Sequence, residues 1–462
     1  MKLAVFLDAS HQQKYVRVIR ETLAGIPETV VEAVGPGTEG SGTAAFLPRN
    51  RLQTWFGPHA AQRIQRLYER FRISLSRSIF YVFISDARWR SYVEKQVFGH
   101  RPDHIILLED NPQGLPGIVA QMARDRGVPF SILPDYIPNP AEPARFFYSD
   151  PSHSADSWVG HLILRFLPRW SLKYQGKILL RLPAKQILVK QLRKQECPQP
   201  WILNAGYCEA IFLESKAMME HYQRLGFIEE KLRVVGGAME DKLHDVFSDR
   251  ETLRHELCDR YGFDSQKPLI VCGFPPDQYN ASTAAFEYLS YNDLCEAWFD
   301  ELCRATPSAN IVVVRHPRLS TRVLTPYLKQ SIILAEQPIE ELLPLCDLYI
   351  ACVSTTIRSA LALAIPTINY DCYRYEYGDF SRAAGIREVD SRERFRATLS
   401  ESLVQDKLVA LKASAASDAR YWGVVDGGFR ARLREAILEV GRAYQGRPTA
   451  THETSFRLEK WG

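Results

Sequence analysis

The sequence has no uninterrupted apolar run of about 18 residues, which is the length that a helix needs to cross a bilayer. We therefore expect no transmembrane helix. The apolar run near the N-terminus covers only residues 3–7 and ends at Asp8. A signal peptide needs a longer apolar core and a small-residue cleavage site, so this run favours a first β-strand.

Cysteine is scarce and unevenly placed. The nine cysteines all lie within residues 197–372, their number is odd, and no C-x-x-C pair occurs. These features argue against a disulfide framework and against a zinc ribbon. We expect reduced, mostly buried thiols in a cytoplasmic protein. The sequence also lacks an Asp-x-Asp motif at a predicted strand end and any His, Asp or Glu cluster with metal-ligand spacing. It therefore predicts no metal site and no cofactor.

The overall composition is ordinary for a globular protein. Of 462 residues, 46% are apolar and 24% are charged, and the formal net charge is only +4. These values exclude a disordered chain and a collagen-like chain. The length exceeds what one hydrophobic core usually fills, so we expect two domains of roughly 200 residues.

Short apolar runs alternate with helical patterns along most of the chain, which predicts parallel sheets covered by helices on both faces. The predicted fold is α/β, with two Rossmann-like doubly wound domains that face each other across a cleft and a C-terminal helix. The expected domains are 1–238, with a basic insertion at about 150–200, then 239–425, then a helix and tail at 426–462. The expected strands are residues 3–7, 79–84, 105–108, 130–133, 202–203, 210–213, 232–235, 269–272, 311–314, 332–334, 348–352 and 367–370. The clearest expected helices are 12–23, 115–126, 293–305, 356–364 and 429–444.

Three loops of the second half follow predicted strands, at the sheet edge where α/β proteins bind ligands. A glycine in the first loop permits close approach of a ligand, and the Arg-His-Pro-Arg run in the second can pair with phosphate. Hydroxyls in the third stand where a strand becomes a helix, which suits an anion. A plain βα turn and simple N-capping are the alternative interpretations. The candidate binding residues are Gly273, Pro275, Arg315, His316, Pro317, Arg318, Ser354, Thr355 and Thr356.

The order of these motifs resembles the nucleotide-sugar domain of GT-B glycosyltransferases. Cys346-Asp347 precedes a strand, Ser354-Thr355-Thr356 follows it, and Ala364-Ile365-Pro366 comes next. The His-Pro loop followed by a Ser/Thr pair looks like bacterial enzymes that use CMP-activated sugars, namely sialyltransferases and Kdo transferases of surface-polysaccharide assembly. That resemblance implies that His316, Pro317, Ser354 and Thr355 hold CMP. CDP-glycerol-type polymerases and UDP-sugar enzymes share much of this pattern, and nucleotide-sugar epimerases share the two-domain plan.

The first half offers candidates for acid–base chemistry. Glu109 and Asp110 follow a predicted strand, where a carboxylate can activate an acceptor hydroxyl. The CMP-sialic acid enzymes that the chain resembles carry an acidic pair followed by glycine in this region, whereas here other residues intervene before Gly114. Helix capping is the alternative role. Asp135 and His11 are two further catalytic candidates.

One segment stands out by charge. Residues 158–195 contain nine Lys or Arg residues and no Asp or Glu, with apolar and aromatic residues between them. Such a stretch favours an anionic membrane surface or a lipid-phosphate acceptor. A solvated insertion packed on the first domain is the alternative. We expect no nucleic-acid partner, because no nucleic-acid-binding module accompanies the charge.

Together these features predict a metal-independent glycosyltransferase at the inner face of a membrane. Its donor would be a nucleotide sugar, with CMP-Kdo or a CMP-nonulosonate favoured, and its acceptor a hydroxyl of a surface glycan or lipid-linked glycan. A UDP-sugar or CDP-glycerol-type transferase, an isomerase resembling the UDP-N-acetylglucosamine 2-epimerases, and a non-catalytic glycan- or nucleotide-binding subunit are the alternatives.

Overall fold

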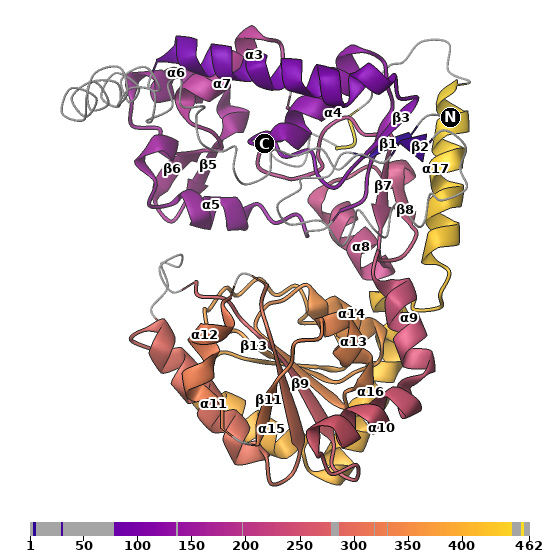
Figure 1. The fold of residues 1–462 in the computed structure, drawn as a ribbon. Helices are drawn as coiled ribbons and strands as arrows, with labels where there is room; N and C mark the ends of the chain where they lie inside the picture. The colour runs from indigo at the N-terminus through magenta and orange to yellow at the C-terminus, as the bar shows by residue number, and fades with distance from the viewer. Residues whose placement is uncertain are drawn as a thin grey trace, which may run out of the picture. The chain divides into compact units, whose positions relative to one another are not determined.

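The computed structural model describes residues 3–5, 29–30, 78–134, 137–195, 197–278, 286–317, 319–329, 331–445 and 454–456. The chain forms two compact units. The first unit consists of residues 1–212, 222–233 and 436–462, and the second of residues 213–221 and 234–435. Each unit is built around its own parallel sheet (Figure 1).

The sheet of the first unit has the strand order β2-β1-β3-β4-β7-β8 among the described residues. Its strands are β1 (Leu3–Val5), β2 (Thr29–Val30), β3 (His104–Leu107), β4 (Phe130–Ile132), β7 (Ala210–Leu213) and β8 (Leu232–Val234). The registered pairs along it are parallel, for example Ile105 with Phe130. The strands predicted from the alternating pattern at 105–108, 130–133, 210–213 and 232–235 are therefore confirmed.

Among the described residues, the first unit also contains helices and one hairpin. The basic insertion predicted at about 150–200 folds as a helix, an antiparallel hairpin and a second helix. The hairpin strands are β5 (Ser171–Tyr174) and β6 (Lys177–Leu180). The helices are α3 (Ile79–Gln96), α4 (Leu115–Asp125), α5 (Ala141–Phe147), α6 (Trp158–Phe166), α7 (Ala184–Leu192) and α8 (Lys216–Leu225), the last of which continues from the second unit into the first.

Two predicted strands of the first half are wrong. Residues 79–84 form the start of α3, because the Ser78 hydroxyl accepts a hydrogen bond from the Phe80 N–H and caps the helix. Phe80 and Ile84 are exposed, so this aromatic and β-branched run is not a buried strand. Residues 202–203 lie in a turn, although Ile202 is buried. A short apolar run without clear periodicity therefore does not fix the backbone conformation.

The sheet of the second unit has the order β11-β10-β9-β12-β13-β14, and all its pairs are parallel. Its strands are β9 (Leu269–Phe274), β10 (Asn310–Arg315), β11 (Ile332–Leu334), β12 (Leu348–Ala351), β13 (Thr367–Tyr370) and β14 (Ile386–Val389). The helices are α9 (Glu240–Ser248), α10 (Arg250–Tyr261), α11 (Tyr291–Ala305), α12 (Thr321–Leu324), α13 (Ile339–Leu342), α14 (Thr356–Ala362), α15 (Arg392–Ser402), α16 (Gln405–Trp422) and α17 (Phe429–Gln445), the last of which continues from the second unit into the first. The predicted C-terminal helix is confirmed as α17.

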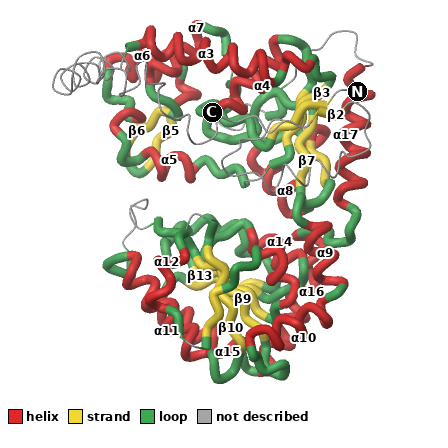
Figure 2. The backbone as a smooth tube through the Cα atoms, in the orientation of Figure 1, coloured by secondary structure: helices red, strands yellow, loops and turns green. Residues whose placement is uncertain are grey.

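Both faces of this sheet are buried, as Figure 2 shows by the helices around the central strands. Alternate residues of β9 point to opposite faces. Ile270, Cys272 and Phe274 pack in one core with residues of α11 and α15. Leu269 and Val271 pack in the other core, with residues of α9, α10, α14 and α16. The continuous apolar run of the sequence therefore belongs to a strand that is covered on both sides.

The nine cysteines carry free thiols, and seven of them are buried, while Cys197 and Cys303 are half-buried. Across the described ranges, every helix is too short or too polar to span a bilayer.

Candidate functional site

The second sheet reverses its direction of growth at β9. In chain order β10 and β11 are added on one side of β9, and β12, β13 and β14 on the other. This is the strand order of dinucleotide-binding α/β domains, in which ligands bind at the carboxyl ends of the strands beside the reversal. The reversal lies between β9 and β12, so the loops after these two strands form the candidate site.

Gly273 lies at the centre of this edge. A Cβ atom at this position would stand 2.4 Å from the hydroxyl oxygen of Tyr349, a side chain of the neighbouring strand β12. Real Cβ contacts do not reach this distance, so only glycine fits without a shift of its neighbours. The tyrosine hydroxyl thus takes the space that a side chain at position 273 would occupy.

Three hydroxyl groups form a chain at this edge. The Tyr349 hydroxyl lies 2.5 Å from Oγ1 of Thr356, which lies 2.8 Å from Oγ of Ser354. Ser354 Oγ also accepts a hydrogen bond from the Thr356 N–H at 3.3 Å. Burial raises the pKa of Tyr349, so its hydroxyl keeps its proton. We call Tyr349, Thr356 and Ser354 the hydroxyl chain; it runs from the interior to the half-buried Ser354.

The loop between β12 and α14, which carries Ser354, is strained. Val353 has a φ of 42°, a left-handed conformation that β-branched residues rarely adopt. The Asn369 side chain of β13 holds it there by accepting a hydrogen bond from the Val353 N–H at 2.9 Å. Thr355 is exposed, and its side chain does not cap α14. Ser354 is thus the hydroxyl that caps this turn, and the Thr355 side chain points to solvent.

The loop after β10 is a tight turn beside β9. The His316 N–H donates to the Phe274 carbonyl at 3.2 Å, and the Leu319 N–H donates to the His316 carbonyl at 2.8 Å. Arg315 is exposed and donates from Nη1 to the Leu319 carbonyl at 2.9 Å. His316 is half-buried and Pro317 exposed. Arg318 lies outside the described residues.

The loop after β9 is fixed by two tyrosines. Tyr291 donates to the Pro275 carbonyl at 2.8 Å, and Tyr373 donates to the Pro276 carbonyl at 2.7 Å. Pro275 itself is buried. The structure therefore brings Gly273, Pro275, Arg315, His316, Pro317, Ser354, Thr355 and Thr356 to one edge of one sheet.

An ion pair anchors the helix that follows the Ser354 loop. Arg358 of α14 pairs with Glu214 at 2.9 Å, and both side chains are largely withdrawn from solvent. Neither this pair nor the role of Tyr349 is predicted from the sequence. In the sequence, Arg358 is one residue of a predicted helix. Tyr349 lies within a predicted strand, where its apolar ring indicates burial but nothing indicates a partner for its hydroxyl. Contacts of this kind depend on which strands lie next to each other in the sheet, and no local sequence pattern predicts them.

In the first unit, Asp110 joins the end of β3 to a distant loop. One carboxylate oxygen accepts from the Asn204 N–H at 2.5 Å and the other from the Gly206 N–H at 2.9 Å. Burial raises the pKa of Asp110 to about 6, although these two bonds act in the opposite direction. The adjacent Glu109 is half-buried. Asp110 thus has a clear positioning role, while the catalytic role of both acids stays a prediction.

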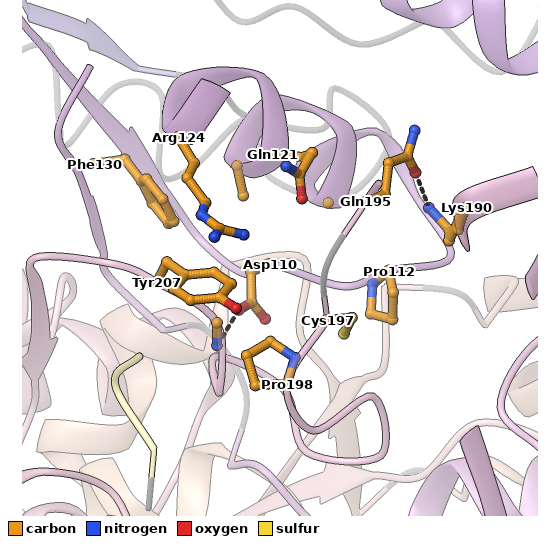
Figure 3. Close-up of a pocket in the computed structure, with 13 residues that line it drawn as sticks. Asp110, Pro112, Gln121, Arg124, Phe130, Lys190, Gln195, Cys197, Pro198 and Tyr207 are labelled. Carbon is orange, nitrogen blue, oxygen red and sulfur yellow. Dashed lines mark hydrogen bonds between the residues drawn. The ribbon is translucent and has the colours of Figure 1, made fainter. Parts of the chain in front are cut away.

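Asp110 also lines a pocket that lies within the first unit (Figure 3). Two cationic side chains share it. Lys190 donates to Gln195 Oε1 at 3.1 Å, and the Arg124 guanidinium lies 3.9 Å from the ring centre of Tyr207. Burial lowers the pKa of Lys190. His11 and Asp135, the other catalytic candidates, lie outside the described residues. In the described part of the chain, no three His, Cys, Asp or Glu side chains are placed to hold a metal ion.

Comparison with known proteins gives likenesses of structure only. No family model matches the sequence, and no curated protein matches it. UDP-GlcNAc 2-epimerase from Neisseria meningitidis, whose structure contains UDP-GlcNAc, is similar with a TM-score of 0.51 and 10% identity. The likeness covers 95% of this chain and 100% of the epimerase.

Two other solved structures have similar extents. A protein from Listeria monocytogenes described as a UDP-N-acetylglucosamine 2-epimerase has a TM-score of 0.51 and 12% identity, over 97% of this chain and 98% of its own. The wall teichoic acid polymerase TagF, in a structure with CDPG, has a TM-score of 0.48 and 11% identity, over 96% of this chain and 90% of that one. The two epimerase likenesses show that the chain has a GT-B-like α/β fold with two parallel sheets.

Proposed function

We propose that this protein is an enzyme that binds a nucleotide-activated sugar at the β9/β12 edge and transfers the sugar to an acceptor hydroxyl. One observation carries the proposal. At the point where the second sheet reverses, a glycine, the hydroxyl chain and the His316-Pro317 turn stand on three adjacent strand ends. Hydroxyl and backbone N–H donors beside a side-chain-free strand end suit the phosphate oxygens of a nucleotide.

We favour UDP or CDP over CMP as the nucleotide of the donor. The Neisseria epimerase that shares the fold is bound to UDP-GlcNAc. CDP-activated donors stay in the proposal because the motif order in this sequence is shared with CDP-glycerol-type enzymes. CMP-Kdo and CMP-nonulosonate, which the His-Pro and Ser/Thr motifs suggested, have less support, since the solved structures described above are not CMP-sugar transferases.

The proposed reaction moves one sugar. The acceptor oxygen bonds to the anomeric carbon, and the bond from that carbon to the phosphate oxygen breaks. The acceptor's proton passes to a carboxylate, for which Glu109 and Asp110 are the described candidates. The departing nucleotide gains negative charge, which the hydroxyls of Ser354 and Thr355, His316 and Arg315 would stabilise by hydrogen bonds and charge. A glycan or lipid-linked glycan is the proposed acceptor.

Titration with nucleotides tests the proposal. We expect UDP or CDP to bind more tightly than CMP and GDP, and to raise the melting temperature of the protein. The variants H316A and S354A/T355V should each weaken that binding by at least about tenfold, since each hydrogen bond to a charged group contributes about 1.5–3 kcal/mol and about 1.4 kcal/mol is a factor of ten. H255A and S417A are matched controls, because these two residues are exposed on α10 and α16. Unchanged affinity in both site variants would refute the assignment.

The likeness to two epimerases supports a second candidate, in which the bound nucleotide sugar is isomerised. The two reactions differ in what they require. An isomerase converts UDP-GlcNAc into a second UDP-sugar when no acceptor is present, whereas a transferase releases the nucleotide only when an acceptor is supplied. Separation of the nucleotide products with and without acceptor distinguishes them.

A further inference from the structure

Helix α6 has apolar residues both on its buried side and on its exposed side. It begins at a clear N-cap, where the Ser157 hydroxyl accepts from the Gly160 N–H at 3.0 Å. Ile163 is buried against Trp170, Leu180, Leu182 and Ile187. By contrast, Trp158, Leu162 and Phe166 are 76%, 42% and 67% exposed. One side of α6 thus holds the small core of the insertion, and the other presents large apolar side chains to solvent.

The exposed side chains form a single stripe. Trp158, Leu162 and Phe166 are spaced four residues apart, and an α-helix has 3.6 residues per turn, so they lie one above another. Isolated exposed apolar residues are common on protein surfaces, but a row that includes a tryptophan and a phenylalanine is not. Arg165 lies on the same side of the helix, and Arg169 follows in the next turn of chain. We call these five residues the α6 face.

The structure sorts the nine cations of residues 158–195 into two groups. Three have structural roles: Arg181 is buried and donates to the Pro200 carbonyl, Lys190 donates to Gln195, and Arg193 pairs with Asp86. The other six are exposed: Arg165, Arg169, Lys173, Lys177, Lys185 and Lys194. The exposed charge is therefore concentrated on α6, the hairpin that follows it and the two ends of α7.

We propose that the α6 face binds the surface of an anionic phospholipid bilayer, with α6 lying parallel to it. The apolar stripe would enter the boundary between headgroups and acyl chains, where tryptophan is favoured. Arg165, Arg169 and the neighbouring lysines would pair with lipid phosphates. The absence of any acid in residues 158–195 matches a negatively charged partner.

Vesicle sedimentation tests this binding and needs no nucleotide, so its outcome is independent of the proposed reaction. We expect the full chain to sediment with vesicles of phosphatidylcholine and phosphatidylglycerol, more weakly with phosphatidylcholine alone, and less at high salt. R165Q/R169Q should reduce the apparent affinity about tenfold or more, because each Lys or Arg near an anionic surface contributes to the free energy of membrane binding. W158A/F166A should reduce it to a similar extent through loss of apolar burial.

Matched variants on the second unit separate a local surface from general charge. R420Q/R434Q removes two exposed arginines, and V409A removes an exposed apolar residue of α16; both should bind vesicles like the wild type. Circular dichroism checks that all variants are folded. Binding that is equal for all variants, or absent, would overturn the proposal. So would tight binding to single-stranded RNA that depends on the α6 face when vesicles do not bind.

Discussion

The candidate site is organised around Gly273, because the absence of a side chain there leaves room for a neighbouring hydroxyl. The Tyr349 hydroxyl occupies the space that a Cβ atom at position 273 would fill, and it begins the hydroxyl chain that ends at Ser354. A single carbon atom at position 273 would displace that hydroxyl. The geometry of the site is therefore controlled by a contact between two neighbouring strands.

The substitution G273A should weaken nucleotide binding and lower the free energy of unfolding by about 1–3 kcal/mol, the usual cost of forcing an extra methyl group into a packed site. G273A/Y349F should lose less than the sum of the two single variants, since the closest atom to the new methyl group is the tyrosine oxygen. Urea unfolding and nucleotide titration measure both effects. G99A is the control, because its nearest neighbour would be 3.7 Å away. Additive losses would contradict this explanation.

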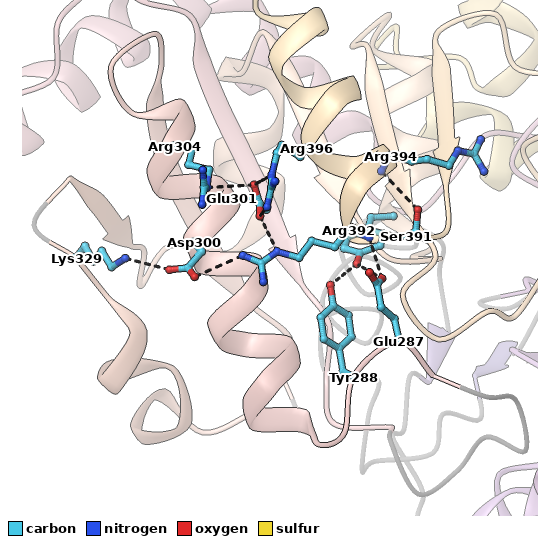
Figure 4. A network of polar contacts seen from close by, with 11 residues as sticks. Glu287, Tyr288, Asp300, Glu301, Arg304, Lys329, Ser391, Arg392, Arg394 and Arg396 are labelled. Atoms are coloured by element: carbon cyan, nitrogen blue, oxygen red, sulfur yellow. Dashed lines mark hydrogen bonds and ion pairs between the residues drawn. The ribbon is translucent and has the colours of Figure 1, made fainter.

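At the scale of elements, α11 and α15 are joined by a buried carboxylate (Figure 4). Glu301 of α11 accepts from Arg392 Nε at 2.6 Å and from Arg396 Nη2 at 2.7 Å, and its own side chain is only 1% exposed. Burial by itself raises the pKa of Glu301, but the hydrogen bonds from the two arginines outweigh it and lower the pKa overall. These two helices cover the same face of the second sheet.

The variant E301Q should lower the free energy of unfolding by about 1–2 kcal/mol, because it removes the carboxylate charge that Arg392 and Arg396 bind, although both arginines are partly exposed and Arg392 keeps its pair with Asp300. Denaturant unfolding at neutral pH measures this cost. R394Q removes an arginine of the same helix whose partner, Asp390, is exposed, and should cost less than about 1 kcal/mol. Similar costs for the two variants would show that Glu301 does not hold the helices together.

At the scale of the whole molecule, buried acids of two kinds set how stability depends on pH. The pKa of Glu240 is raised to about 8 by burial, and that of Asp110 to about 6. Asp347 and Glu301 have lowered pKa values, because hydrogen bonds and charges from Lys412, Arg254 and the α15 arginines outweigh the effect of burial. The two kinds act in opposite directions.

The sign follows from proton binding. Between pH 4.5, the ordinary pKa of a glutamate, and about 8, the folded protein keeps a proton on Glu240 that the unfolded chain has lost. The free energy of unfolding therefore falls as pH rises through this window. Asp347 and Glu301 contribute stability above their ordinary pKa values, and that contribution is lost as pH falls through their lowered ones. His104, whose pKa burial lowers to about 4, acts in the opposite sense to Glu240 between about pH 4 and 6.5, so we expect the net decline in stability above about pH 6.5.

The variant E240Q should flatten the decline on the alkaline side. One proton fewer is exchanged on unfolding, so the slope between about pH 6.5 and 8 should become shallower by up to about 1.4 kcal/mol per pH unit. Urea unfolding at a series of pH values measures the slope. E251Q is the control, because Glu251 is exposed on α10. A slope that E240Q leaves unchanged would show that Glu240 is ionised in the folded protein.

Net charge says little about this molecule, whereas its distribution says much. The formal charge of +4 averages a single basic segment and a remainder that is net acidic, since residues 158–195 alone hold nine cations. The sequence located that segment, but it could not show that Arg181, Lys190 and Arg193 are used inside the fold. Only the packing of α6, the hairpin and α7 leaves the α6 face and six cations exposed.

Most of the strands, the two-sheet α/β plan and the loops after β9, β10 and β12 could be predicted from the sequence, because they depend on local apolar periodicity and turn residues. The prediction failed at residues 79–84 and 202–203, where apolar content without periodicity does not distinguish a strand from a buried turn or a capped helix. The Tyr349–Thr356 contact, the strained Val353 and the Glu214–Arg358 pair were decided only by the tertiary structure. Each depends on which strands become neighbours, and that follows from the packing of the whole sheet rather than from any one segment.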